Sequence, residues 1–272
     1  MRTVVLRRTL ARDIRIEGRG LHSGAAVAVR VMPGESGLRI NGTAAVAENV
    51  TDTSRCTVLG GVGVVEHLLS ALGGLGITDA EIEVVGGEMP GLDGSAGPWV
   101  RAILESGVAE IGPAEFPVLF DRVYEKDHET PADRRADLAA ARGSGHFRFT
   151  FETPADRWPG VQTAEVRLQS PAEYAEQIAP ARTLVFDFEL PHVERLGLGR
   201  GLDESSCIVL DPAGPRGDTR FPDEPARHKL LDLIGDMTLT GLPLSTLDVT
   251  ARKSGHRTHV ALALKVREAL GL

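Results

Sequence analysis

The sequence predicts an α+β fold made of two similar domains, each a β-sheet packed with two main helices. Short segments that alternate apolar and polar residues occur in both halves, which is typical of β-strands. In each half a helix-like run that carries a histidine, Glu66-His67 or Arg227-His228, leads through a Gly-Leu turn to a strand and a further helix. This recurrence indicates a duplicated β-α-α-β sandwich, with an active site between the domains.

The domain boundary is expected near residue 115. The segment 107–117 contains two glycines and two prolines, a composition typical of linkers. An N-terminal domain of residues 1–115 and a C-terminal domain of residues 116–272 are both of ordinary size.

The first domain is expected to begin with strands and to end with helices. Period-two segments separated by glycines fill its first forty residues or so. The expected elements are strands within 2–40, at 44–47 and at 56–59, a helix at 64–72, a strand at 80–85, a turn-rich loop at 90–98 and a helix at 99–105.

The second domain repeats this order with longer insertions. Residues 125–145 are charged and rich in alanine, so we expect a solvated hairpin or a mobile loop there. The other expected elements are strands at 118–120, 146–152, 164–168 and 181–186, short helices at 174–178 and 191–196, a strand at 207–210, a helix around 227–236, a strand at 245–251 and a terminal helix through residue 270.

The composition is that of a folded protein outside the nucleic-acid-binding class. Hydrophobic residues make up 42% and charged residues 25%, which is too apolar for a disordered chain and too mixed for a membrane protein. The net charge of -8 argues against nucleic-acid binding, because that task needs a basic surface. Cys56 and Cys207 lie far apart, which indicates neither a disulfide framework nor a thiolate zinc site.

We expect a cytoplasmic monomer. The first eight residues have too short an apolar core for a signal peptide, and no run of about 18 apolar residues occurs in the chain. Transient contact of a surface helix with lipid stays open.

The segment 227–236 carries the clearest chemical signal. His228 and Asp232 are four residues apart, so on a helix their side chains share one face with Cβ atoms about 5–6 Å apart. One metal ion can bridge such a pair, although a capped or salt-bridged pair is the more frequent explanation. A metal site needs a third ligand, and the matching helix of the first domain provides His67. A pseudo-twofold axis between the domains would bring these three residues together.

Two histidines and one carboxylate with an open fourth position are the usual components of a catalytic zinc site. Zinc makes a water molecule acidic near neutral pH and polarises a carbonyl oxygen. Glu66, directly before His67, is placed to act as the general base for that water. Taken alone, the Glu66-His67 pair also fits a helix-start acid beside a half-buried imidazole. Fe(II) would accept the same ligands as zinc.

Four further residues are candidates for a role in catalysis. Lys229 is placed to neutralise charge on a substrate or an oxyanion, and it also fits a solvated helix face. Thr183 can donate a hydrogen bond to a tetrahedral oxyanion. His256, in a loop after a glycine, is a candidate general acid, and Asp236 is placed to hold it protonated. Four other histidines are assigned to structural or surface positions: His128, His146, His192 and His259. The role of His22 is left undecided.

Several separate motifs follow one another along the chain. They are Val65-Glu66-His67-Leu68-Leu69, Leu92-Asp93-Gly94-Ser95-Ala96, Ala181-Arg182-Thr183, His228-Lys229 with Asp232 and Asp236, and Ser254-Gly255-His256. In this order they resemble the UDP-3-O-acyl-N-acetylglucosamine deacetylases, the LpxC family of lipid A biosynthesis. The glycine-rich segments 18–24 and 197–201 also fit, and the resemblance covers about residues 8 to 270.

The resemblance implies a zinc-dependent hydrolase that releases acetate from the N-acetyl amide of UDP-3-O-acyl-N-acetylglucosamine. The acyl chain of this substrate would run through an apolar passage at an insert of about residues 184–200. The implied metal ligands are His67, His228 and Asp232, and the implied general base is Glu66. The implied acid or electrostatic partner is His256, which Asp236 would orient. Thr183 and Lys229 are implied to assist at the carbonyl and the substrate.

The chain departs from the family pattern in places that bear on substrate choice. Leu184 stands where the family usually has phenylalanine, and the connections at 60–63 and 201–204 are shorter. These departures bear on acyl-chain length and on how the cleft closes. Two alternatives therefore stay open: a related metal-dependent deacetylase of another N-acetylated sugar, and a non-catalytic binding homologue.

Overall fold

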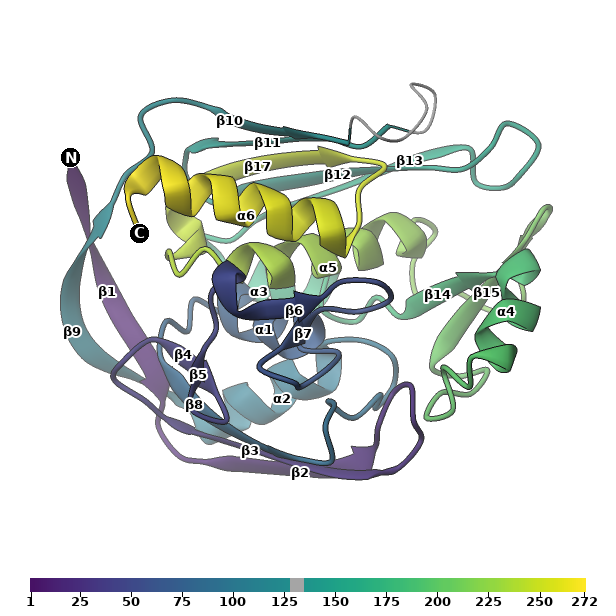
Figure 1. Cartoon of the computed structure of the whole chain (residues 1–272), viewed down its shortest axis with the longest axis horizontal. Helices are drawn as coiled ribbons and strands as arrows, with labels where there is room; N and C mark the ends of the chain where they lie inside the picture. The colour runs from purple at the N-terminus through teal and green to yellow at the C-terminus, as the bar shows by residue number, and fades with distance from the viewer. Residues whose placement is uncertain (128–134) are drawn as a thin grey trace.

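Two five-stranded sheets lie on opposite sides of the molecule, with helices packed between them (Figure 1). The structure is a computed structural model, and it describes residues 1–127 and 135–272. The expectation for His128 lies outside the described residues. No helix within the described ranges is long and apolar enough to cross a membrane.

The first sheet has the strand order β2-β3-β8-β4-β5, in which only β8 and β4 run parallel. Along β8, alanine, isoleucine and valine are buried and alternate with two glutamates that point outward, which fixes one apolar face. Helices α1 (Glu66–Gly74) and α2 (Gly97–Ser106) belong to this half. Its strands are β2 (Ile14–Arg19), β3 (Ala26–Pro33), β4 (Leu38–Ile40), β5 (Thr43–Ala44) and β8 (Ala80–Val85).

The second sheet repeats this topology strand for strand. Its order is β10-β11-β17-β12-β13, and only β17 and β12 run parallel. Helices α5 (Glu224–Thr238) and α6 (His256–Leu270) take the places of α1 and α2. The strands are β10 (Val123–Lys126), β11 (Asp137–Arg142), β12 (His146–Glu152), β13 (Val161–Arg167) and β17 (Leu247–Arg252). The predicted α+β fold with two similar sheet-and-helix halves is confirmed.

The remaining elements are insertions and connections. In each half an insertion precedes the helix that bears the histidine: η1 with β6 and β7 in the first half, and the small sheet β14-β15-β16 with α4 in the second (Figure 1). Their bounds are η1 (Ala47–Asn49), β6 (Val50–Asp52), β7 (Val58–Leu59), α3 (Pro171–Gln177), β14 (Thr183–Phe186), η2 (Asp187–Glu189), α4 (Leu190–Arg195), β15 (Cys207–Asp211), β16 (Gly214–Pro215) and η3 (Leu244–Thr246).

Helices α1 and α5 cross in direct backbone contact at the centre of the molecule. A Cβ added to Gly235 would lie 2.1 Å from the carbonyl oxygen of Glu66, and one added to Gly73 would lie 2.3 Å from Oγ1 of Thr238. Glycine is therefore required at position 235, where a side chain would clash with backbone, and at position 73 it makes room for the side chain of Thr238. Because the axes approach this closely, the side chain of His67 on α1 meets those of His228 and Asp232 on α5.

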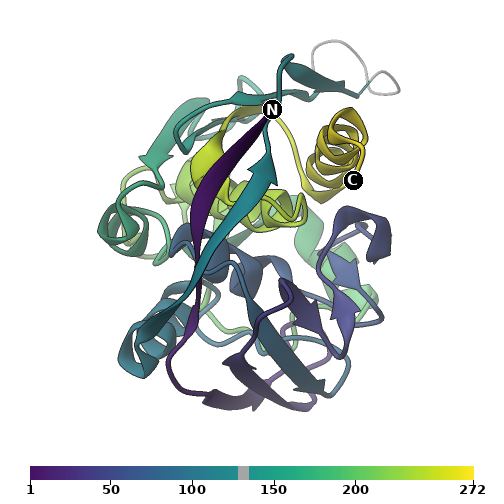
Figure 2. The same ribbon diagram turned by 90° about the vertical axis from the view of Figure 1, so that its left-hand side faces the viewer.

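The expectation of a linker at 107–117 is wrong. These residues form β9 (Val108–Pro117), which pairs antiparallel with β1 (Arg2–Leu10) in a two-stranded ribbon along the side of the molecule (Figure 2). Both strands of a two-stranded ribbon are edge strands, so the prolines of β9 are tolerated there. The expected boundary near residue 115 falls inside this strand, and the division into two domains stays a prediction.

Two further expectations in the second half need correction in whole or in part. Residues 118–120 do not form a strand, and β10 starts later, at Val123. The alanine-rich stretch expected as a solvated hairpin or mobile loop contributes β11, which pairs antiparallel with β10 as in a hairpin, and its residues 128–134 lie outside the described ones. The strand is not solvated on both faces, because Leu138 and Ala140 are buried. Small alanine side chains supply enough apolar surface for one sheet face, although the charges around them made the stretch look solvated.

Candidate active site

Three potential metal-ligand atoms converge from α1 and α5. Nε2 of His228 lies 3.4 Å from Oδ1 of Asp232, and Nε2 of His67 lies 3.8 Å from the same oxygen. The two imidazole rings stand edge to face with centroids 5.2 Å apart. The three residues are at least 95% buried, with one ligand atom from each within 4.8 Å of the others. The expected meeting of the two His-bearing helices is therefore found.

The donor set fits a divalent metal ion. Nδ1 of His228 lies 3.1 Å from the carbonyl oxygen of Ala181, which can only accept, so Nδ1 carries the proton and Nε2 presents a lone pair to Asp232. Burial lowers the pKa of His67 to about 3 and also lowers the pKa of His228, so both rings are neutral. Although burial opposes ionisation of Asp232, Lys229 holds its pKa below the usual range. Three lone-pair donors that face one another are stabilised by a cation between them.

Lys229 contacts the expected ligand set directly. Its ammonium donates to Oδ2 of Asp232 at 2.9 Å, and a quarter of its side chain is exposed toward the cavity. Thr183, the first residue of β14, lines the same cavity, and its backbone N–H donates to the carbonyl of Gly94 at 2.8 Å. The Leu-Asp-Gly-Ser-Ala motif of the first half therefore holds the residue expected at the oxyanion.

Glu66, His256 and Asp236 form a second group beside the three expected ligands, in which both carboxyl groups are buried and His256 is partly exposed. Nδ1 of His256 donates to Oδ2 of Asp236 at 2.8 Å, and Nε2 of His256 lies 3.7 Å from Oε1 of Glu66. Burial raises the pKa of Glu66 to about 7. Although burial opposes it, the carboxylates of Asp236 and Glu66 raise the pKa of His256 to about 10. The structure thus places a carboxyl group that titrates near neutral pH beside an imidazolium.

His256 occupies a different position from the one expected. It is the first residue of α6 rather than part of a loop, and Gly255 before it is extended, with φ of −153°. Glycine at this position is therefore not explained by a left-handed turn. The backbone strain lies instead at Lys253, which has a φ of 54°.

A cavity of about 570 Å³ opens over this group and combines apolar and polar walls. Leu184, Phe186 and Phe151 line one part of it. Three cationic residues also line it, and each forms an ion pair with a carboxylate: Arg55 with Glu189, Lys253 with Glu152 and Arg257 with Asp127. A ligand that combines an apolar chain with charged or polar groups fits such a lining.

Two histidines outside the expected site take part in its surroundings. The ring nitrogens of His22 are buried against the cavity and have no hydrogen-bond partner among the described residues. His259 is fully buried, donates from Nδ1 to Oδ2 of Asp236 at 2.8 Å and contacts Ser254 through Nε2. The glycines around His22 are the only sequence signal that marks either position.

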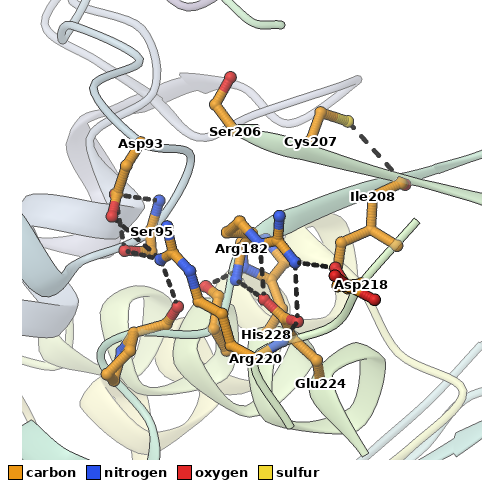
Figure 3. A network of polar contacts seen from close by, with 12 residues as sticks. Asp93, Ser95, Arg182, Ser206, Cys207, Ile208, Asp218, Arg220, Glu224 and His228 are labelled. Atoms are coloured by element: carbon orange, nitrogen blue, oxygen red, sulfur yellow. Dashed lines mark hydrogen bonds and ion pairs between the residues drawn. The ribbon is translucent and has the colours of Figure 1, made fainter. Parts of the chain in front are cut away.

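A buried ion pair holds the backbone next to Thr183 against the start of the helix that carries His228 (Figure 3). Nε of Arg182 donates to Oε1 of Glu224 at 3.0 Å and Nη2 donates to Oε2 at 3.2 Å, while the backbone N–H of Arg182 donates to Oε1 at 2.9 Å. Glu224 is the first residue of α5 and is fully buried. The pair therefore ties the start of α5 to the segment that carries the Ala181 carbonyl.

The same network joins the two halves of the chain. Arg220 donates to Oδ2 of Asp93 at 3.0 Å and to the carbonyl oxygen of Pro180 at 2.8 Å (Figure 3). Asp93 also accepts from the hydroxyl of Ser95 at 2.7 Å. The motifs of residues 92–96 and 181–183, separate in the sequence, are thus parts of one hydrogen-bonded assembly.

Comparison with known proteins identifies close relatives over nearly the whole chain. The family model described as UDP-3-O-acyl N-acetylglycosamine deacetylase matches residues 7–268. A UDP-3-O-acyl-N-acetylglucosamine deacetylase of Myxococcus xanthus is 37% identical over 278 residues, which cover 95% of this chain and 85% of the relative. Proteins of the same name from Trichormus variabilis and Mannheimia succiniciproducens are 32% and 35% identical, over 95% and 93% of this chain and 97% and 87% of their own lengths.

Proposed function

Because the chain belongs to the UDP-3-O-acyl-N-acetylglycosamine deacetylase family, we propose that it hydrolyses the N-acetyl amide of UDP-3-O-acyl-N-acetylglucosamine and releases acetate in lipid A biosynthesis. The observation that carries the proposal is the convergence of three buried ligand atoms from two helices beside a carboxyl group and an imidazolium. A binding module that had lost turnover would have no need of this acid and base beside the ligand set.

His67, His228 and Asp232 would hold the metal ion. Two imidazoles and one carboxylate suit zinc, and Fe(II) accepts the same ligands. When bound, such an ion polarises a carbonyl oxygen and lowers the pKa of water. The chain fixes the tautomer of His228 through Ala181 and holds the second oxygen of Asp232 through Lys229, so the ligand atoms are oriented in advance.

Glu66 and His256 divide the proton transfers between them. With a pKa raised to about 7 by burial, Glu66 suits a general base that takes a proton from the attacking water near neutral pH. His256, whose pKa is raised to about 10 by Asp236 and Glu66 against the effect of burial, stays protonated and can give its proton to the leaving amine. Asp236 orients the ring by accepting from Nδ1.

Thr183 and Lys229 complete the polar surroundings of the amide. The hydroxyl of Thr183 at the cavity wall can donate to the carbonyl oxygen as negative charge develops on it. Lys229 adds positive charge to the same cavity. The apolar wall that includes Leu184 and Phe186 supports an acyl chain, and the cationic residues of the cavity support a diphosphate.

The test measures acetate release by purified protein with its metal content determined. We expect release from UDP-3-O-acyl-N-acetylglucosamine by the zinc-loaded or iron-loaded protein, and loss of both metal and activity in His67→Ala. Absence of release from the metal-loaded protein contradicts the proposal. Equal activity on unacylated UDP-N-acetylglucosamine would favour a deacetylase of another N-acetylated sugar, which the unusual Leu184 keeps open.

A further inference from the structure

Thr57 lies at the junction of the base, the acid pair and the helix that carries the base. It sits just before β7 and is fully buried. Its carbonyl accepts from the backbone N–H of Val65 at 3.3 Å, at the start of α1. Its backbone N–H donates to Oε2 of Glu66 at 3.0 Å, and its hydroxyl donates to Oδ1 of Asp236 at 2.6 Å. All three polar groups of this residue are therefore used inside the site.

The two donors of Thr57 take the carboxylate oxygens that do not face His256. In Glu66, Oε2 is bound by Thr57, which leaves Oε1 at 3.7 Å from Nε2 of the imidazole. In Asp236, Oδ1 is bound by Thr57, which leaves Oδ2 at 2.8 Å from Nδ1 of the same ring and at 2.8 Å from Nδ1 of His259. One residue thus fixes the rotation of both carboxyl groups.

We propose that Thr57 is a positioning residue for the deacetylation. Its hydroxyl and its N–H fix the orientations of Asp236 and Glu66 so that one oxygen of each carboxyl group faces His256. The inference rests on the proposed function, because the roles of base and acid come from it. The hydroxyl is the part that only the side chain provides. Threonine and serine supply this donor, whereas valine has nearly the same shape and lacks it.

Removing the hydroxyl leaves Oδ1 of Asp236 buried without that donor and frees the carboxylate to turn. The N–H that holds Glu66 belongs to the backbone and survives substitution. Loss of an outer hydrogen bond to a catalytic group typically costs a factor of about 10–100 in activity. Because Thr57 touches no substrate in this scheme, the loss should appear in kcat and leave KM nearly unchanged.

The experiment compares Thr57→Val, Thr57→Ser and the matched control Thr238→Val in the metal-loaded protein. Thr238 is also a buried threonine at the α1–α5 contact, where its hydroxyl donates to the carbonyl oxygens of Leu69 and Ile234. We expect Thr57→Val to lower kcat by a factor of about 10–100, Thr57→Ser to restore it, and Thr238→Val to keep the wild-type kcat. Equal losses in Thr57→Val and Thr57→Ser, or in Thr57→Val and Thr238→Val, would overturn the proposal.

A second readout does not depend on the substrate. In protein labelled with nitrogen-15 at histidine, the Nδ1–H resonances of His256 and His259 report on their shared bond to Asp236. We expect both resonances to shift in Thr57→Val and to stay in place in Thr57→Ser. If the wild type releases no acetate, the proposed function fails, and these resonances still decide whether Thr57 orients Asp236. Unchanged resonances in Thr57→Val refute the inference.

Discussion

Replacing Glu224 by alanine should break its buried ion pair with Arg182 at the start of α5. Glu224 is fully buried and accepts four hydrogen bonds, three of them from Arg182 and one from the backbone N–H of Arg220. Removing one partner of a buried pair typically costs about 3–5 kcal/mol, because the other charge stays buried without compensation. Arg182 would keep its bonds to the carbonyls of Ser205 and Asp218. We therefore expect the lower end, about 3 kcal/mol of the free energy of unfolding.

The assay is unfolding by urea of the metal-free protein, with the free energy taken by linear extrapolation. The control is Asp211→Ala, which removes the partner of Arg216 in an ion pair at the surface. Solvent screens that pair, so the control should leave the stability nearly unchanged. The reasoning is refuted if Glu224→Ala is as stable as the control. Because Arg182 adjoins the Ala181 carbonyl that orients His228, zinc affinity of the variant should also fall by a factor of about 10–100.

Three further predictions follow from the packing, the charges and the ligand set. Gly235→Ala should lower the unfolding free energy by about 1–3 kcal/mol or more, measured by urea titration, because its Cβ would lie 2.1 Å from the carbonyl oxygen of Glu66; wild-type stability would contradict this. Although burial opposes it, Arg7 holds the pKa of Asp79 below its usual value. The stabilisation of the folded state by this ion pair is therefore complete above the unfolded pKa near 3.8 and is lost as pH falls through the lower folded pKa. The stability advantage of the metal-free wild type over Asp79→Asn should therefore shrink below about pH 4, and an advantage constant down to pH 2 would count against the pair. Chelation should lower the thermal midpoint of the wild type and added zinc should restore it, whereas His67→Ala should respond to neither.

Local patterns in the sequence carried much of the fold. The alternation along β8 and β12 and the apolar runs of α1 and α5 follow from contacts two to four residues apart, which a sequence displays directly. The duplication in the sequence predicts that His67 lies near His228 and Asp232. In contrast, β9 was hidden by its prolines and glycines, because an edge position that tolerates them is a property of the pairing with β1.

What the sequence by itself determined is therefore the fold class, the repeated unit and the residue types of the candidate site. Only the tertiary structure decided how the site is held. Thr57 meets a carboxylate 179 positions away, and Arg182 meets Glu224 across 42 positions. No periodicity encodes such contacts. The first exists only where α1 and α5 cross at Gly235, and the second only where the residue before β14 packs against the start of α5. That packing sets the distances among Glu66, Asp236 and His256 and among the three candidate metal ligands.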